Sequence, residues 1–244
     1  MTDAADPALP LLSVQDLSAG YGAVPVLKRV SMQVQRAEMV ALVGSNGAGK
    51  TTLLRVLSGL LHGTSGQVRF QGQDISRLKP DRIFGLGLVQ VPEGRQLFGR
   101  MTVKDNLLMG AYRRHDKPAI RHDLDHVYTL FPRLAERRRQ LAGSMSGGEQ
   151  QMCAMARALM AAPVLMMIDE MSLGLAPVIV QQLMEILAEI RKAGVTVLLV
   201  EQDVQVALSG ADRAYVLETG EVVLSGTARE LIDDPAVQRA YLGV

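Results

Sequence analysis

The sequence predicts an α/β fold in which a parallel sheet carries an antiparallel β flank and an inserted helical subdomain. Three observations indicate this architecture. Strand-length apolar segments alternate with helical segments along much of the 244-residue chain, as in parallel sheets. Residues 11–40 alternate between apolar and polar side chains, as half-buried paired strands do. Residues from about 100 to 160 follow a shift in composition and are mostly helical in pattern, which predicts the subdomain.

The elements of the first half are justified by their local patterns. Two or three strands with turns at Gly20 and Gly22 fill residues 11–40. The continuous apolar run MVALVG is typical of a buried strand, and the glycine-rich segment after it opens a helix with the sequence KTTLLRVLSGLL. The chain then returns to strand in GQVRFQGQDI and GLVQV before the helical subdomain.

The second half alternates again between strand and helix. PVLMMID and VTVLLV are strand-length apolar runs, and between them PVIVQQLMEILAEIRKAG predicts a helix that ends at a glycine cap. RAYVLETGEVVLSG predicts a hairpin with its turn near Gly220. We expect residues 11–244 to form a single domain, preceded by a loose polar tail at residues 1–10.

Composition argues against several classes of protein. The formal net charge of +1, with 21% charged residues, gives no general attraction to nucleic acid or anionic lipid. Cys153 is the single cysteine, so no internal disulfide is expected, and we predict a small buried residue there rather than a reactive thiol. No run approaches the roughly 18–20 apolar residues of a membrane span, and the start lacks the pattern of a secretory signal.

The strongest chemical signal is GSNGAGKT, which fits the pattern G-x-x-x-x-G-K-[ST] between a strand and a helix. Glycines let backbone N–H groups approach phosphate oxygens, and the helix N-terminus adds positive potential. We expect Lys50 to reach the β and γ phosphates and the Thr51 hydroxyl to bind Mg²⁺. The predicted ATP-binding residues of this segment are Gly44, Ser45, Asn46, Gly47, Ala48, Gly49, Lys50, Thr51 and Thr52.

A phosphate site with Mg²⁺ needs a carboxylate at the end of a neighbouring strand, and VLMMIDE supplies two. We expect Asp169 to hold the metal, directly or through water, and Glu170 to orient and deprotonate the attacking water. Taken alone, such an acidic pair could equally face solvent. Together with the phosphate loop it favours a catalytic site.

A third signal is MSGGEQQ, which predicts a second helix start able to bind an anion. Ser146 stands at the N-cap position, and Gly147 and Gly148 leave the first N–H groups accessible, with Glu149 next. One nucleotide has no use for two such helix starts on one side of its γ-phosphate. A second copy of the chain, or a relative, placed head to tail would use this one. An ordinary capped helix is the alternative, and the position one helix before Asp169 favours the anion site.

These three motifs, in this order and spacing, resemble those of the ATP-binding cassette (ABC) ATPases over essentially residues 11–244. The resemblance implies a P-loop, RecA-like core and two ATPase subunits that sandwich ATP and Mg²⁺. It also implies that Tyr21 stacks on adenine and that SLGL, residues 172–175, joins the two nucleotide sites. VPEGRQLFGRMTVKDNL matches the segment that touches a membrane subunit and senses Mg²⁺.

The chain departs from the family pattern at two functional positions. The Mg²⁺-sensing loop usually carries Gln, where this sequence has Glu93; a carboxylate there can still reach Mg²⁺ or its water, with a changed local charge. The switch strand usually ends in His, whereas VTVLLVEQ ends in Gln202. We expect Gln202 to serve catalysis as a neutral hydrogen-bond donor to the γ-phosphate, which does not titrate.

VPEGR, SLGLAP, LLVEQ and the ending AYLGV together resemble the ATP-binding subunits of branched-chain amino acid importers. This implies a second ABC ATPase subunit, identical or related, two transmembrane permease subunits and, indirectly, a periplasmic or surface substrate-binding protein, with no nucleic acid. It also implies a peripheral position on the cytoplasmic face of the inner membrane. A urea or amide importer, a lipopolysaccharide-exporter ATPase and a non-transport ABC clamp are the alternatives. Glu93 favours amino acids over urea, because the ATPases of urea importers tend to have Gln in this motif.

Two further features receive plain interpretations. His122 and His126 share one helix face, but two ligands do not close a zinc site, so no zinc is expected there. ERRRQ, residues 136–140, predicts a solvated helix surface; contact with lipid headgroups or a partner loop is the alternative.

Overall fold

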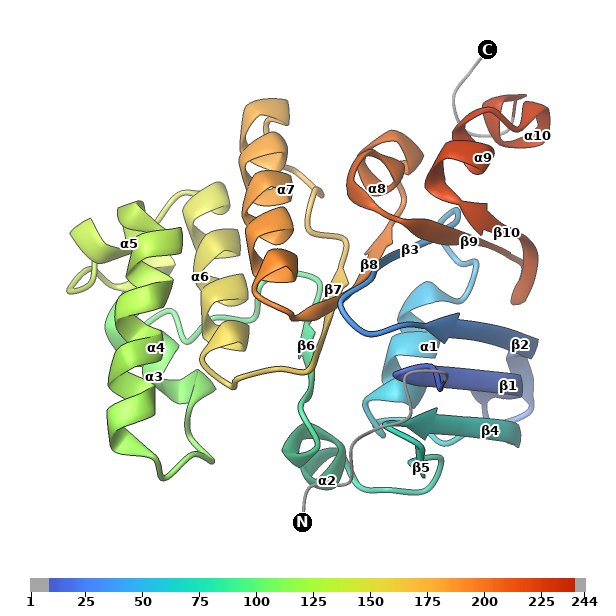
Figure 1. Ribbon diagram of the computed structural model, residues 1–244, viewed down its shortest axis with the longest axis horizontal. Coiled ribbons are helices and arrows are strands. Elements are labelled where there is room, and N and C mark those ends of the chain that lie inside the picture. The colour runs from blue at the N-terminus through green and yellow to red at the C-terminus, as the bar shows by residue number, and fades with distance from the viewer. Residues whose placement is uncertain (1–8, 240–244) are drawn as a thin grey trace.

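The computed structural model describes residues 9–239 and contains two sheets with helices around them (Figure 1). Most of the predicted tail at residues 1–10, and the last five residues of the predicted domain, lie outside the described residues. The larger sheet has six strands in the order β10-β9-β3-β8-β7-β6. Their bounds are β3 Met39–Val43, β6 Leu88–Val91, β7 Leu165–Asp169, β8 Thr196–Glu201, β9 Arg213–Glu218 and β10 Glu221–Thr227.

The larger sheet is parallel except at its hairpin edge. Strands β9, β3, β8, β7 and β6 pair in parallel, and β10 pairs antiparallel with β9 through a turn that contains Gly220. Side chains of one strand alternate between the two faces of the sheet. In β8, Leu198 and Val200 enter the core around α1 (Lys50–Leu57). Val197 and Leu199 enter a second core, formed with α6 (Gly147–Leu159) and α7 (Pro177–Lys192). Apolar cover on both faces explains why these strands are continuous apolar runs.

The smaller sheet is the predicted antiparallel flank. Its order is β2-β1-β4-β5, with β1 Leu12–Tyr21, β2 Val24–Val34, β4 Ser65–Phe70 and β5 Gln73–Asp74. Leu17 of β1, Leu54 of α1 and Leu42 of β3 belong to the same buried core. Helix α1, which begins directly after the glycine-rich loop Gly44–Gly49, is therefore held by residues of both sheets.

The helices of the middle of the chain lie away from the smaller sheet, on the green and yellow side of Figure 1. They are α3 Val103–Gly110, α4 Lys117–Leu130, α5 Pro132–Glu136, the 3-10 turn Ala142–Ser144 and α6 Gly147–Leu159. Asn106 is fully buried and ties this part to the preceding loop, because its side chain accepts from Phe98 N–H and donates to the Phe98 carbonyl. The remaining helices are α2 Pro80–Gly85, α7 Pro177–Lys192, α8 Val204–Gly210, α9 Ala228–Ile232 and α10 Pro235–Val237.

At residues 136–140 the predicted exposure to solvent is confirmed, whereas the predicted helix is wrong. Helix α5 ends at Glu136, and the chain turns through Arg137 toward the start of α6. There the Arg137 guanidinium forms an ion pair of 2.7 Å with Glu149. Arg138 and Arg139 are exposed. Within residues 9–239, no helix is long and apolar enough to cross a membrane.

Candidate functional site

The segment from Gly44 to Gly49 joins the end of β3 to the start of α1 and forms a tight loop that two glycines make possible. A Cβ atom at Gly44 would lie 2.3 Å from the Leu217 carbonyl oxygen. Gly49 has a φ of +112°, which L side chains rarely adopt. The glycines therefore leave the backbone open where a phosphate would approach the first N–H groups of α1.

Lys50 is the first residue of α1, and its side chain folds back under the loop. Its ammonium donates to the carbonyl oxygens of Gly44, at 2.8 Å, and Ser45, at 3.2 Å. It also forms an ion pair of 3.2 Å with the Glu170 carboxylate at the end of β7. Lys50 is only 4% exposed. The structure thus brings the predicted phosphate lysine and the predicted general base into direct contact.

An open pocket of about 540 Å³ surrounds these two side chains. Its described lining is Val26, Asn46, Gly47, Gly49, Lys50, Thr51, Thr52, Glu93, Glu170, Leu173 and Gln202. Glu93 and Gln202 come from separate loops, after β6 and β8, and both are exposed. Because parallel strands end at the same edge of the sheet, the loops that carry Glu93 and Gln202 meet at one place.

Asp169 lies beneath this pocket and is 2% exposed. Burial, reinforced by the negative charges of Glu170 and Glu93, raises its pKa to about 6, although the Thr51 hydroxyl donates a hydrogen bond to it. Its Oδ1 atom has no hydrogen-bond partner among the described residues. A buried carboxylate oxygen without a partner beside a threonine hydroxyl suits a hard divalent cation, which prefers oxygen ligands. These two residues therefore fit Mg²⁺.

Replacing Asp169 by asparagine is expected to stabilise the chain in metal-free buffer at pH 7. A folded pKa of about 6 lies above the unfolded value of about 3.9, so the folded state holds more protons between these values. The wild-type free energy of unfolding should therefore fall as the pH rises from about 4 to 6, and asparagine should remove roughly 1–3 kcal/mol of that loss. Urea denaturation across this pH range in EDTA measures it. Equal slopes for both proteins would contradict the buried-charge interpretation.

Tyr21, the predicted adenine contact, lies at the end of β1 beside Thr52 but is not among the residues that line the pocket. Arg55 donates to its hydroxyl at 2.8 Å, and the guanidinium stands 5.8 Å from the ring centroid. The ring is 44% exposed. Stacking on adenine stays a prediction that the exposed ring permits.

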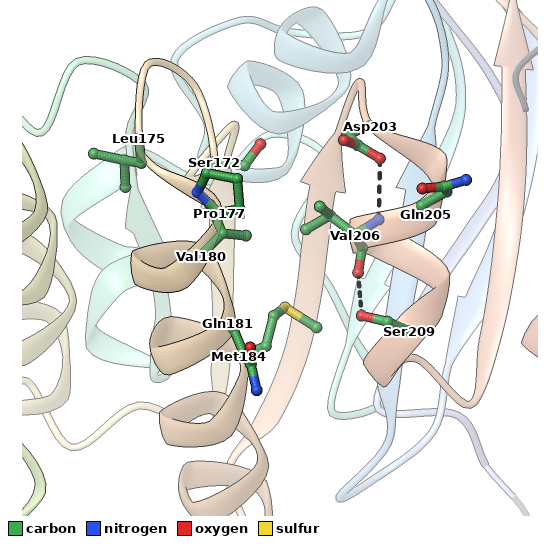
Figure 2. A pocket seen from close by; sticks show the side chains of 10 residues that line it. All are labelled: Ser172, Leu175, Pro177, Val180, Gln181, Met184, Asp203, Gln205, Val206 and Ser209. Atoms are coloured by element: carbon green, nitrogen blue, oxygen red, sulfur yellow. Dashed lines mark hydrogen bonds between the residues drawn. The ribbon is translucent and has the colours of Figure 1, made fainter.

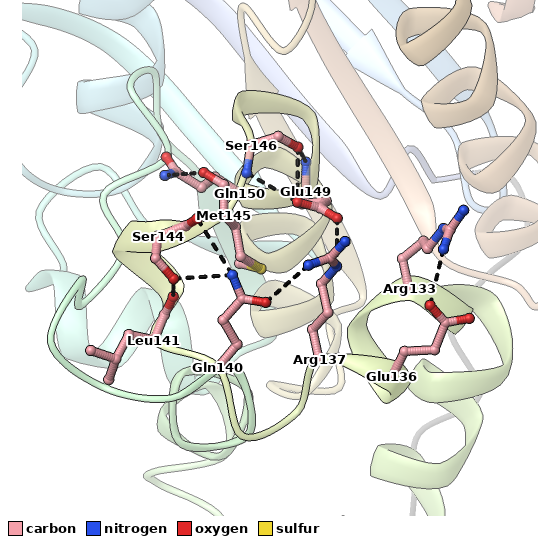
Figure 3. Close-up of polar contacts among 10 residues, drawn as sticks. All are labelled: Arg133, Glu136, Arg137, Gln140, Leu141, Ser144, Met145, Ser146, Glu149 and Gln150. Atoms are coloured by element: carbon pink, nitrogen blue, oxygen red, sulfur yellow. Dashed lines mark hydrogen bonds and ion pairs between the residues drawn. The ribbon is translucent and has the colours of Figure 1, made fainter.

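The predicted anion site at Ser146 lies elsewhere in the single chain, since none of Ser146, Gly147, Gly148 and Glu149 lines the pocket around Lys50. Ser146 caps α6, and its hydroxyl and N–H both donate to Glu149, at 2.9 and 3.0 Å. Figure 3 shows Glu149 between Ser146 and Arg137, whose guanidinium is in turn held by Gln140. Arg137 and Gln140 thus hold the capped start of α6 in place, and sequence reasoning missed this support.

A second residue missed by sequence reasoning is Arg157 of α6. It donates to the carbonyl oxygens of Gln96, at 2.8 Å, and Arg95, at 3.3 Å. Arg95 and Gln96 have φ values of +65° and +46°, which cost conformational energy in non-glycine residues. Arg157 therefore stabilises the strained backbone at Arg95 and Gln96. Glu93, two residues before Arg95, lines the pocket around Lys50. Arg157 lies far along the chain from Arg95 and Gln96, so no local sequence pattern predicts this contact.

Cys153 is fully buried in α6, and burial raises its thiol pKa to about 11. This confirms the prediction of a small buried residue and argues against a reactive thiolate at neutral pH.

The family model described as ABC transporter matches residues 27–172. The high-affinity branched-chain amino acid transport ATP-binding protein BraG of Pseudomonas aeruginosa is 48% identical over 233 residues, which cover 96% of this chain and 100% of that protein. The lipopolysaccharide export system ATP-binding protein LptB of Acidithiobacillus ferridurans is 33% identical over 233 residues, covering 96% and 97%. The crystal structure of the ADP conformation of MJ1267, an ATP-binding cassette of an ABC transporter, superposes with a TM-score of 0.85 at 25% identity, covering 97% of this chain and 100% of that one.

Proposed function

The chain belongs to the ABC transporter family as an ATP-binding subunit, and we propose that it hydrolyses ATP to drive the import of branched-chain amino acids through separate membrane subunits. The observation that carries the catalytic part is the contact between Lys50 and Glu170 above the buried Asp169. The substrate class is supported by the 48% identity to BraG, against 33% to the export protein LptB.

The geometry supports a defined role for each residue. The N–H groups of the phosphate loop and the Lys50 ammonium bind the β and γ phosphates, for which the phosphate oxygens must compete with the Glu170 carboxylate. Asp169 and Thr51 would hold Mg²⁺, which neutralises charge on the phosphates when bound. Glu170 accepts a proton from the water that attacks the γ-phosphorus, while the bridging oxygen leaves with ADP. Glu93 faces the same space, and Gln202 can donate to a γ-phosphate oxygen.

A second ATPase subunit, identical or related, would complete each site. The start of α6 presents Ser146, Gly147 and Gly148 away from the pocket of its own chain. In a head-to-tail dimer this start would meet the γ-phosphate held by the partner. The Ser146 hydroxyl would then exchange its bond to Glu149 for one to the phosphate, while Arg137 continues to hold Glu149.

Replacing Ser146 by arginine is expected to leave ATP binding by the isolated chain unchanged but to abolish hydrolysis, because the substituted residue serves the partner's nucleotide. Mixing this variant with Lys50→Ala chains should restore at most one of the two composite sites. Titration with a fluorescent ATP analogue and ATPase assays of the mixtures measure both effects. Ser225→Arg on exposed strand β10 is the control. Loss of ATP affinity by the isolated Ser146→Arg chain would refute the head-to-tail arrangement.

Membrane subunits would contact a groove between the loop after β6 and the helices α3 and α6. It has a volume of about 380 Å³, and its lining includes Phe98, Met109, Tyr112 and Arg113. Tyr112 is 77% exposed and Phe98 46% exposed, which is unusual for aromatic side chains gathered in one place. This groove supports a helical segment of a permease as partner, and with it a position on the cytoplasmic face of the membrane.

The proposed function is tested by reconstituting the chain in liposomes with membrane subunits and a substrate-binding protein co-purified from the native host. We expect ATP-dependent uptake of radiolabelled leucine, isoleucine or valine, which urea does not compete. Uptake of urea or an amide instead would refute the substrate class. ATP hydrolysis without uptake of any of these solutes would favour an exporter.

A further inference from the structure

Glu201 is a buried carboxylate that the mechanism above does not use. It ends β8, directly before Gln202, and is 1% exposed. A buried charge is costly unless it is hydrogen-bonded. Burial raises the pKa of Glu201, which hydrogen bonds from Ser172 oppose. The other residues of β8 are apolar apart from one threonine. A carboxylate buried among them needs a hydrogen-bond donor to offset the cost of its burial.

That partner is Ser172, the first residue of the SLGL loop. The Ser172 N–H donates to Glu201 Oε1 at 3.0 Å, and its hydroxyl donates to Oε2 at 2.7 Å. Both oxygens of one carboxylate thus bind one residue. This contact joins the start of the SLGL loop to the strand end that carries Gln202.

The same contact closes the turn that carries Glu170. The Glu170 backbone has a φ of +46°, and its N–H donates to the Val200 carbonyl at 2.8 Å. The chain then reverses so that Ser172, two residues on, reaches Glu201. A left-handed glutamate is strained and persists only when its surroundings fix it. Val200 and Glu201 fix it from both ends of the turn.

Packing alone does not hold the SLGL loop. Leu173 is 56% exposed, and Ser172 borders an open pocket of about 420 Å³ between α7 and α8 (Figure 2). In Figure 2 the loop at the head of α7 faces Asp203 at the start of α8 across this space. The far end of the loop is held by Leu175, which packs against the core beside α7. With solvent on one side of the loop, the two bonds to Glu201 fix its start.

We infer that Glu201 is a positioning residue for ATP hydrolysis, which holds the SLGL loop and the turn bearing Glu170 in the geometry that both nucleotide sites require. The inference rests on the proposed function, in which Glu170 is the general base, and on the expected role of SLGL as the loop that joins the two nucleotide sites. Glu201 itself touches neither the phosphates nor the water; it acts through Ser172 and the backbone of residues 170–172.

The test compares two substitutions of similar size. Glu201→Met removes both acceptors but also a buried charge, so the fold should be retained or stabilised. Glu201→Gln can accept from the Ser172 N–H and donate to its hydroxyl, so it can rebuild both bonds. Hydrogen–deuterium exchange of residues 170–176, in the full chain without nucleotide, measures how firmly this segment is held. ATP hydrolysis with the membrane subunits measures how the loss of these bonds changes kcat and KM.

For Glu201→Met we expect faster exchange at Ser172, kcat lower by about tenfold and KM within about threefold of the wild type, as for a displaced catalytic group. Glu201→Gln should restore most of the exchange protection and of kcat. Wild-type exchange and kcat in Glu201→Met would overturn this inference and leave the proposed function standing. Equal losses in both variants, or a kcat loss that follows the melting temperature, would do the same. A wild-type chain without any turnover would refute the proposed function, and with it the catalytic part of this inference.

Discussion

The Glu170→Gln chain is expected to bind ATP at least as tightly as the wild type and to hydrolyse it slower by about two orders of magnitude or more. Glutamine keeps the size of the side chain but cannot accept the proton of the attacking water. Affinity should not fall, because the Glu170 carboxylate competes with phosphate for the Lys50 ammonium, 3.2 Å away. The variant should therefore accumulate an ATP-bound dimer.

Size-exclusion chromatography with ATP and Mg²⁺ shows the dimer, and single-turnover hydrolysis measures the rate. Glu189→Gln is the matched control, because it makes the same substitution on the exposed face of α7. Glu189 forms an ion pair there with Lys192. A Glu170→Gln chain that turns over normally, or that remains monomeric with ATP, would remove Glu170 from its role as general base.

Replacing Lys50 by alanine is expected to lower ATP affinity by about two orders of magnitude or more, because the β and γ phosphates lose their main cation in a site that shields it from water. Lys50 is 4% exposed, so its charge is little screened by solvent. The substitution also leaves the Glu170 carboxylate facing the phosphates without its ion pair, which adds repulsion. Calorimetric titration with ATP measures the affinity.

Lys192→Ala, which removes an exposed lysine from the end of α7, serves as control for the loss of one positive charge. Near wild-type affinity in the Lys50→Ala chain would mean that the loop around Gly44–Gly49 does not bind phosphate. The two substitutions have opposite effects, since Lys50→Ala should weaken ATP binding and Glu170→Gln should retain bound ATP.

The glycine-rich loop Gly44–Gly49 and the Asp169–Glu170 pair could be placed at strand ends from sequence, because each follows a short local pattern. The alternation of apolar runs likewise predicted the parallel sheet, since strands buried on both faces have to be apolar throughout. The structure then added the contact between Lys50 and Glu170, which joins two motifs far apart in the chain.

The supporting residues could not be predicted in the same way. Glu201 and Ser172 are 29 positions apart, and only the strand order of the sheet brings them together. The charged run at residues 136–140 predicts a solvated helix surface, whereas the helix ends at Glu136 and Arg137 lies in the turn after it. Its ion pair with Glu149 depends on where α5 ends, and such boundaries follow from tertiary packing rather than from local preference.

Helix α1 shares one buried core with both sheets, and this has a consequence for cooperativity. Separating the smaller sheet from the larger one would expose apolar side chains of α1, because Leu17, Leu42 and Leu54 belong to the same buried core. A ligand seated at the first turn of α1 therefore stabilises both sheets as one thermodynamic unit. At a concentration about 100 times its dissociation constant, the linkage amounts to about 2.7 kcal/mol for the entire domain. A bound nucleotide would thus raise the free energy of unfolding even for strands that do not contact the nucleotide.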